Sequence, residues 1–90
     1  MLIRRVIGES MQPTLRPGQL VFAIKSKQYS VNNLVIAKQD SREVLKRIAK
    51  INNGQYFLTG DNAQASTDSR QLGTVDAQAI LGRVIWPKRF

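Results

Sequence analysis

Apolar residues occur along this chain in short runs that are separated by glycine, proline, asparagine and aspartate. The longest run without a polar residue is Leu20–Ile24. Short apolar runs bounded by turn-forming residues are typical of the strands of an all-β domain. The pattern predicts strands at about residues 2–8, 19–25, 33–39, 42–51, 54–59 and 79–86.

Three segments predict how these strands connect. Asn53-Gly54 lies between two apolar runs, and this dipeptide is a strong short-range signal of a two-residue hairpin. Asp76 could begin a short helical turn, but Gly82 and the β-branched residues after it favour a return to strand. Residues 61–73 form one long polar loop, and a loop of that length in a short chain is usually functional or disordered.

The composition indicates an ordinary globular domain. The chain has 90 residues, of which 42% are hydrophobic and 22% are charged, and this predicts a single domain over residues 1–90 with one modest core. The sequence contains no cysteine and no histidine. Disulfides and thiol catalysis are therefore excluded, and little basis is left for a zinc site. We expect neither a metal nor a cofactor.

The apolar runs are also too short to place this chain in a membrane. None approaches the roughly 20 residues that a membrane-spanning helix requires. The first residues include two arginines but no apolar segment long enough for a signal peptide. We therefore expect a cytoplasmic protein without a membrane anchor.

The net charge of +8 comes from 14 lysines and arginines against 6 acidic residues, and it suggests an acidic partner such as nucleic acid or an anionic membrane surface. One hypothesis is therefore a non-catalytic, basic small β-barrel that binds nucleic acid or an acidic protein. However, the basic residues are scattered and form no dense block. This favours a solvated basic surface, with no nucleic-acid partner expected and peripheral membrane contact left open.

A different hypothesis starts from Ser10, the first residue of the segment Ser10–Leu15. A serine hydroxyl is a poor nucleophile until a neighbouring base accepts its proton, and in a chain without histidine a neutral lysine is the plausible base. The ordinary lysine pKa of about 10.4 must then fall by several units, which burial away from water can accomplish.

Lys46 is the lysine best placed for this role. On an alternating strand it shares a face with Val44, Ile48 and Lys50, while the residues between them point to the other face. Its nearest neighbours on that face are therefore apolar. A solvated strand lysine and a turn-forming Ser10 are the simpler alternatives, and periodicity alone does not exclude them.

The polar loop gathers residues with special conformational and hydrogen-bonding properties. Gly60 can adopt backbone angles that other residues cannot, and the two residues after it can hydrogen-bond within their own turn. Asp68 and Arg70 are candidates for an ion pair, and Ser66 is a candidate to hydrogen-bond a buried amine. The alternative is a polar loop that only caps one end of a small barrel.

Three motifs with these residues follow one another along the chain. They are Gly8-x-Ser10-Met11-x-Pro13-Thr14-Leu15, Lys46-Arg47-Ile48 and Gly60-Asp61-Asn62-x-x-x-Ser66-x-Asp68-Ser69-Arg70. Each motif could occur by chance, but three in the right order with compatible gaps form a strong signal. Together they resemble the bacterial type I signal peptidase family, and the resemblance covers nearly the whole chain.

This resemblance implies a role for each of the candidate residues. Ser10 is expected to be the nucleophile, Lys46 the general base, and Ser66 the residue that orients the lysine amine. The residues expected to support the loop are Gly60, Asp61, Asn62, Asp68 and Arg70. The residues expected to line a shallow apolar pocket, for the residue before the cleaved bond, are Met11, Leu15 and Leu45.

The resemblance also implies a fold and an activity. The fold is the small coiled-sheet, barrel-like catalytic core of signal peptidases and repressor proteases, without a membrane anchor or a large accessory domain. The activity is that of a serine endopeptidase that removes an N-terminal extension or leader from a protein precursor through an acyl-enzyme. Within this family, the short, unanchored nickel-type superoxide dismutase maturation proteases fit in length.

Two departures from the family pattern bear on these expectations. Only nine residues precede Ser10, whereas signal peptidases carry membrane-spanning segments there. Gly8 stands where many members have a serine that helps to bind the oxyanion, so the backbone N–H of Ser10 is the expected donor. A self-cleaving repressor-type protein is a further alternative, but nothing before Ser10 resembles a DNA-binding domain.

Overall fold

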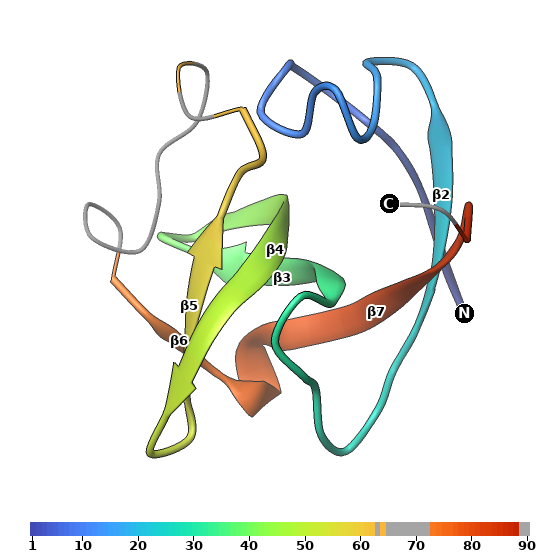
Figure 1. The fold of residues 1–90 in the computed structure, drawn as a ribbon. Coiled ribbons are helices and arrows are strands. Elements are labelled where there is room, and N and C mark those ends of the chain that lie inside the picture. Colours follow the sequence, from blue (N-terminus) through green and yellow to red (C-terminus); the bar gives the residue numbers. More distant parts are fainter. Residues whose placement is uncertain (63, 65–72, 89–90) are drawn as a thin grey trace.

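The computed structural model describes residues 1–62, 64 and 73–88. Over these residues the chain forms an antiparallel, 7-stranded sheet in the order β1-β2-β7-β3-β4-β5-β6 and no α-helix (Figure 1). The strands are β1 (Leu2–Arg5), β2 (Leu20–Ile24), β3 (Leu34–Gln39), β4 (Arg42–Asn52), β5 (Gln55–Thr59), β6 (Val75–Asp76) and β7 (Ile80–Trp86). The all-β fold class expected from the sequence is confirmed.

All the predicted strands form, and their ends differ from the prediction by a few residues at most. The largest difference is in β1, which ends at Arg5 and does not continue to Gly8. Gly8 has a φ of 78°, which breaks an extended strand and which glycine adopts without the strain of a side chain. The additional strand β6 has 2 residues, too few to leave an alternating pattern in the sequence.

Local sequence explains both of the expected connections. Asn53 and Gly54 have φ angles of 52° and 76°, and they join β4 to β5. Positive φ at both central positions defines a type I′ turn, which suits the twist of two paired strands. Before β7, the 3₁₀ turn η2 (Ala77–Ala79) is capped by Asp76, whose carboxylate accepts a hydrogen bond from the N–H of Ala79 at 3.0 Å.

The sheet is coiled, because its register shifts within β2, β3 and β4. β-Bulges of this kind bend a strand and increase its twist. The strands at the two edges of the sheet are β1 and β6. Coiling brings the edge strand β1 toward β4, so that Arg4 on β1 forms an ion pair with Glu43 on β4.

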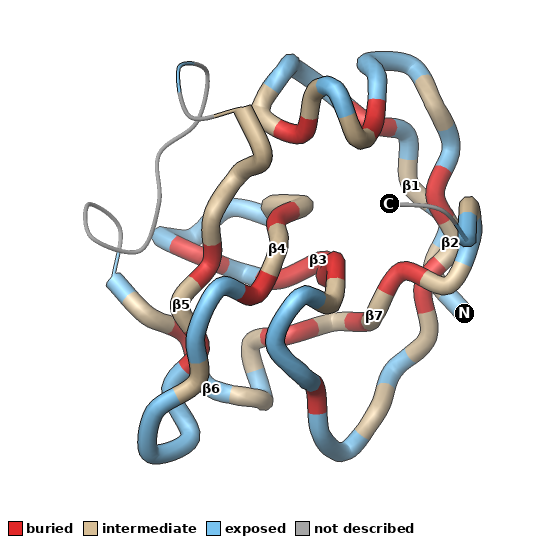
Figure 2. The backbone as a smooth tube through the Cα atoms, viewed as in Figure 1, coloured by how far each residue is buried: buried red, intermediate tan, exposed pale blue. Residues whose placement is uncertain are grey.

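The hydrophobic core lies on both faces of β3. Leu34 and Ile36 belong to one buried cluster, and Val35 and Ala37 belong to another, as the alternation of a strand requires. Figure 2 shows buried residues along most of the strands and also on the turn that follows β1. Because β3 is enclosed on both sides, it gives β4 a rigid neighbour along Arg42–Arg47.

The second half of β4 corrects one sequence prediction. Strict alternation placed Lys50 on the same face as Lys46, but the register shift between Ile48 and Lys50 reverses the alternation. Lys50 is exposed, and its ammonium lies 5.8 Å from the centre of the Phe57 ring. Ile51 packs against the core cluster instead. The prediction for Lys50 was therefore wrong, whereas Lys46, before the bulge, is buried.

We expect Leu34→Ala to lower the free energy of unfolding by about 2–5 kcal/mol, because it leaves a cavity beside β4 in a fully buried cluster. Urea denaturation measures this change. Val31→Ala is the matched control, since Val31 is 47% exposed and its truncation should change stability by less than about 0.5 kcal/mol. Equal effects of the two substitutions would contradict this account of the core.

Candidate active site

A cavity of about 470 Å³ opens beside β4. The N-terminal part of the chain lines it with residues 4–7, Ser10 and Met11, and β3 and β4 line it with Ile36 and residues 42–46. This volume lies within the range of about 300–1,000 Å³ that is usual for ligand sites. The coiling of the sheet therefore forms one pocket from segments that are distant in the sequence.

Ser10 and Lys46 both line this cavity. Ser10 is half-buried in the turn that follows β1, whereas Lys46 on β4 is 5% exposed. The strand partner of Lys46 is the fully buried Val35, and Ile48 lies on the same face of β4. The ammonium-bearing side chain of Lys46 is therefore largely withdrawn from water and lies beside apolar residues.

The turn that carries Ser10 is closed by its own backbone. The N–H of Gln12 donates to the carbonyl of Glu9 at 3.1 Å, and the N–H of Leu15 donates to the carbonyl of Met11 at 2.8 Å.

Of the residues expected to form the apolar pocket, Met11 and Leu45 line the cavity. Leu15 is fully buried in the core cluster and is not among the lining residues, so it anchors the turn.

Asp61 connects the loop after β5 to β4 and to the serine turn. Its carboxylate accepts hydrogen bonds from Nε of Arg47 at 2.9 Å and from Nη2 of Arg47 at 2.8 Å, and also one from the hydroxyl of Thr14. The side chains of Arg47 and Asp61 are 20% and 16% exposed. Hydrogen bonding, chiefly from Arg47 and also from Thr14, lowers the pKa of Asp61, although burial opposes this shift.

Asn62 holds the serine turn directly. Its backbone N–H donates to the carbonyl of Ser10 at 2.7 Å, and its side-chain amide donates to the carbonyl of Glu9 at 3.1 Å. Figure 1 shows the segment after β5 reaching the turn that follows β1. Asp61 and Asn62 thus link the Ser10 turn to the strand of Lys46.

The remaining residues expected in this loop lie outside the described part of the chain. They are Ser66, Asp68 and Arg70. Their expected roles stay predictions.

Three side chains acquire a role in the structure that the sequence did not assign to them. Arg47 pairs with Asp61, and the one sequence signal was a charged residue within an apolar run, which requires an acidic partner. Arg4 and Glu43, which both line the cavity, form an ion pair although they are 39 positions apart in the sequence. No local pattern could reveal that contact, because it depends on the coiling of the whole sheet.

Gly8 stands where the sequence resemblance leads one to expect a serine, and its backbone conformation explains the glycine. A Cβ added there would meet no atom within 4 Å, so space does not exclude a side chain. The φ of 78° does disfavour one. In this backbone conformation, glycine is the residue without strain, and a serine donor at this position would require the turn to change.

In residues 1–62, 64 and 73–88, no group of three His, Cys, Asp or Glu side chains could hold a metal ion. Over the same residues, no helix is long and apolar enough to cross a membrane.

Comparison with known families identifies the chain. The family described as signal peptidase, peptidase S26, matches residues 35–88. This chain belongs to that family. The matched part includes Lys46, Arg47 and Asp61, and Ser10 precedes it. No match is found among curated proteins. Membership of the signal peptidase family supports a signal-peptidase-like protease that acts on a protein substrate.

In this member of the signal peptidase family, we expect Asp61→Asn to lower the free energy of unfolding at pH 7 by about 1–3 kcal/mol. The reason is that Arg47 would keep its shielded charge without a carboxylate partner. Asp40→Asn is the control, because it removes the same charge from an exposed turn. Urea denaturation of both variants measures the difference, and equal stability of the Asp61 variant and the parent at pH 7 would contradict the anchoring role.

The difference in unfolding free energy between the parent and Asp61→Asn should depend on pH. A carboxyl whose pKa is lowered in the folded state stabilises the protein fully above its unfolded pKa of about 3.9. This contribution is lost as the pH falls through the lowered pKa of the folded state. The stability difference between parent and Asp61→Asn should therefore shrink as the solution is acidified below about pH 4.

Proposed function

We propose that this chain is a serine endopeptidase in which Ser10 is the nucleophile and Lys46 is the general base. The observation that carries the proposal is that both residues line one cavity, although the chain places them on separate elements. Three further observations support it: the family match, the burial of Lys46, and the hydrogen bonds from Asn62 that hold the Ser10 turn.

The proposed reaction is acyl transfer in two stages. The neutral amine of Lys46 accepts the proton of the Ser10 hydroxyl while Oγ attacks the peptide carbonyl carbon. The backbone N–H of Ser10 is the expected donor to the resulting oxyanion. When the C–N bond breaks, protonated Lys46 gives its proton to the leaving amine, and the acyl group remains on Ser10 as an ester.

Hydrolysis of this ester restores the enzyme. Lys46 accepts a proton from a water molecule as the water oxygen attacks the ester carbonyl, and the proton passes to Oγ of Ser10 when the ester bond breaks. Ser66 is proposed to orient the lysine amine during both stages. The products are the released N-terminal extension and the shortened protein.

The pairing of the strands suggests how a substrate binds. Arg42–Lys46 of β4 pair with β3, whereas pairing of β4 with β5 begins at Arg47. β1 pairs with β2 and lies at the edge of the sheet. Both of these segments line the cavity. We propose that an extended substrate peptide binds there by adding a strand to these edges, with main-chain hydrogen bonds that do not depend on its sequence.

Side chains in the cavity restrict the residue beside the cleaved bond. Met11, Ile36, Leu45 and Val6 give the lining near Ser10 an apolar character, which suits small apolar substrate residues. The proposed substrate is a protein precursor that loses an N-terminal extension. The precursor of a nickel-type superoxide dismutase is the specific candidate to include in a test.

We expect Ser10→Ala to abolish precursor cleavage and Lys46→Met to lower kcat by at least about 100-fold, because the first removes the nucleophile and the second removes the base. A panel of precursor proteins, with cleavage sites read by mass spectrometry, measures this. Lys50→Met is the matched control: it removes a lysine from the exposed side of the same strand and should leave cleavage unchanged. Cleavage that survives both active-site substitutions, or a parent protein that cleaves no precursor, would contradict the proposal.

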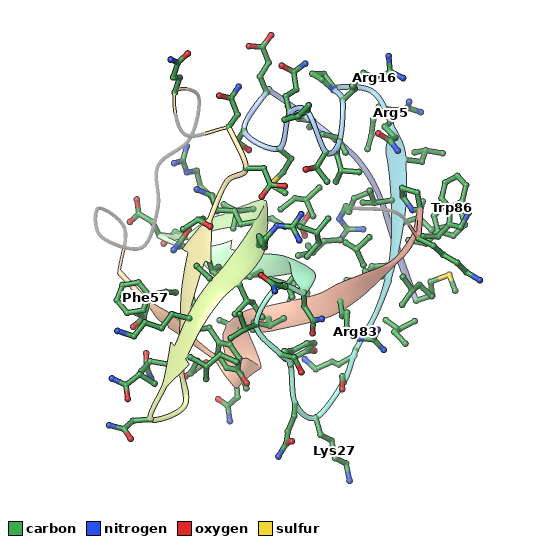
Figure 3. All side chains as sticks on the ribbon, in the orientation of Figure 1. Arg5, Arg16, Lys27, Phe57, Arg83 and Trp86 are labelled. Atoms are coloured by element: carbon green, nitrogen blue, oxygen red, sulfur yellow. The ribbon has the colours of Figure 1, made fainter. Side chains whose placement is uncertain are left out.

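The outer face of β1, β2 and β7 suggests where the protease acts. Ile3 and Trp86 are 53% and 51% exposed. Both lie opposite Phe22 in the sheet, and the rings of Phe22 and Trp86 are 5.5 Å apart between centres. Figure 3 shows Trp86 and Arg5 on the same side of the molecule. Because aromatic and basic residues together suit the boundary of an anionic bilayer, we propose peripheral contact of this face with a membrane.

We expect Trp86→Gln to weaken binding to vesicles that contain phosphatidylglycerol by about tenfold, because it removes apolar area that the lipid would bury. Cosedimentation measures the binding, which should also fall as salt screens the basic residues. Val31→Gln is the control, as Val31 is similarly exposed but is not on these strands. A parent protein that does not bind the vesicles, or equal binding by both variants, would overturn the membrane contact.

A further inference from the structure

An ion pair joins β1 to β4 at one end of the cavity. Nε of Arg4 donates to Oε2 of Glu43 at 2.6 Å, and Nη2 of Arg4 donates to Oε1 of Glu43 at 3.1 Å. β1 and β4 are not neighbours in the sheet, so this contact crosses between two separate strand edges. The side chains are 41% and 32% exposed and both line the cavity, which leaves them accessible to a bound peptide.

The lining of the cavity at this end carries an excess of positive charge. Its charged residues are Arg4, Arg5, Arg42 and Glu43. Glu43 is the only acidic residue among the described residues that line the cavity. Lys38 lies opposite it in β3. Hydrogen bonding from Arg4, followed by the attraction of Arg4 and Lys38, lowers the pKa of Glu43 against the effect of burial. A carboxylate is therefore favoured at this place, and the protein supplies one of its own.

The spacing along β4 relates this end of the cavity to the cleaved bond. Lys46 and Glu43 are three positions apart on one strand, and an extended chain advances by about 3.3 Å per residue. The ion pair thus lies about 10 Å along the strand from the proposed base. A peptide bound along β4 with its cleaved bond at Lys46 would bring a residue about three positions from that bond next to Arg4.

This inference rests on the proposed protease function. We propose that Arg4, Arg42 and Glu43 form a specificity subsite that favours an acidic substrate side chain about three residues from the cleaved bond. When no substrate is bound, the Glu43 carboxylate accepts the hydrogen bonds of the Arg4 guanidinium. When the substrate binds, its carboxylate replaces that of Glu43 as the partner of Arg4. A basic side chain at the same substrate position is disfavoured, because it meets two arginines and only one carboxylate.

The experiment starts from one peptide whose cleavage depends on Ser10. Glutamate, glutamine and lysine are placed in turn at each position within about five residues of the cleaved bond on either side, and kcat/KM is measured for each peptide. We expect one position, about three residues from the bond, at which the glutamate peptide is cleaved about fivefold better than the lysine peptide. This ratio should fall as ionic strength rises.

Variants of the subsite separate charge selection from a structural role. Arg4→Gln should bring the glutamate-to-lysine ratio at that position close to one, whatever its effect on the cleavage of each single peptide. Glu43→Gln should raise the ratio, because it removes the competing carboxylate. Lys27→Gln is the control for the change in net charge, since Figure 3 places Lys27 on a loop far from β1 and β4 in the view and Lys27 does not line this cavity.

The outcomes separate this inference from the proposed function. A parent protein that cleaves the peptides without charge preference at any position, or a ratio that Arg4→Gln leaves unchanged, overturns the subsite and leaves the Ser10–Lys46 assignment standing. If no peptide is cleaved in a manner that depends on Ser10, the proposed function itself fails, and the subsite fails with it.

Discussion

The paired hydrogen bonds between Arg47 and Asp61 are the contact on which the geometry of the site depends. They fasten the loop after β5 to β4 at the residue next to Lys46. The following residue, Asn62, binds the backbone of the turn that carries Ser10. One anchor therefore sets the positions of two side chains that come from separate elements. Both partners are largely shielded from water, so solvent and salt weaken this pair less than an exposed one.

The adjacency of Lys46 and Arg47 lets one strand place two basic side chains in different surroundings. Successive residues of a strand point to opposite faces. Lys46 therefore lies among apolar neighbours, while the permanently charged Arg47 reaches Asp61 on the other side. The bulge that follows Ile48 ends this arrangement and turns Lys50 to the solvent.

The cavity is lined by strand edges that have no neighbouring strand within the sheet of the described residues. An open strand edge is a liability, because it invites pairing with other chains. Here the edge of β1 and the first half of β4 line the same cavity, so an edge that would promote association is turned toward a place where a substrate peptide could bind. The ion pair of Arg4 and Glu43 joins β1 to β4, and both side chains line this cavity together with Ser10 and Lys46.

The sequence by itself determined the features that depend on local chemistry. Short apolar runs located the strands, and Asn53-Gly54 specified the hairpin. The ordered motifs predicted roles for Ser10, Lys46 and the loop from Gly60, and these roles stay predictions. The tertiary structure alone decided that Leu15 belongs to the core, that Arg47 pairs with Asp61, and that Arg4 meets Glu43. Those outcomes depend on how far the sheet coils. Coiling is the sum of twist and bulges over many strands, so no short segment of sequence records it.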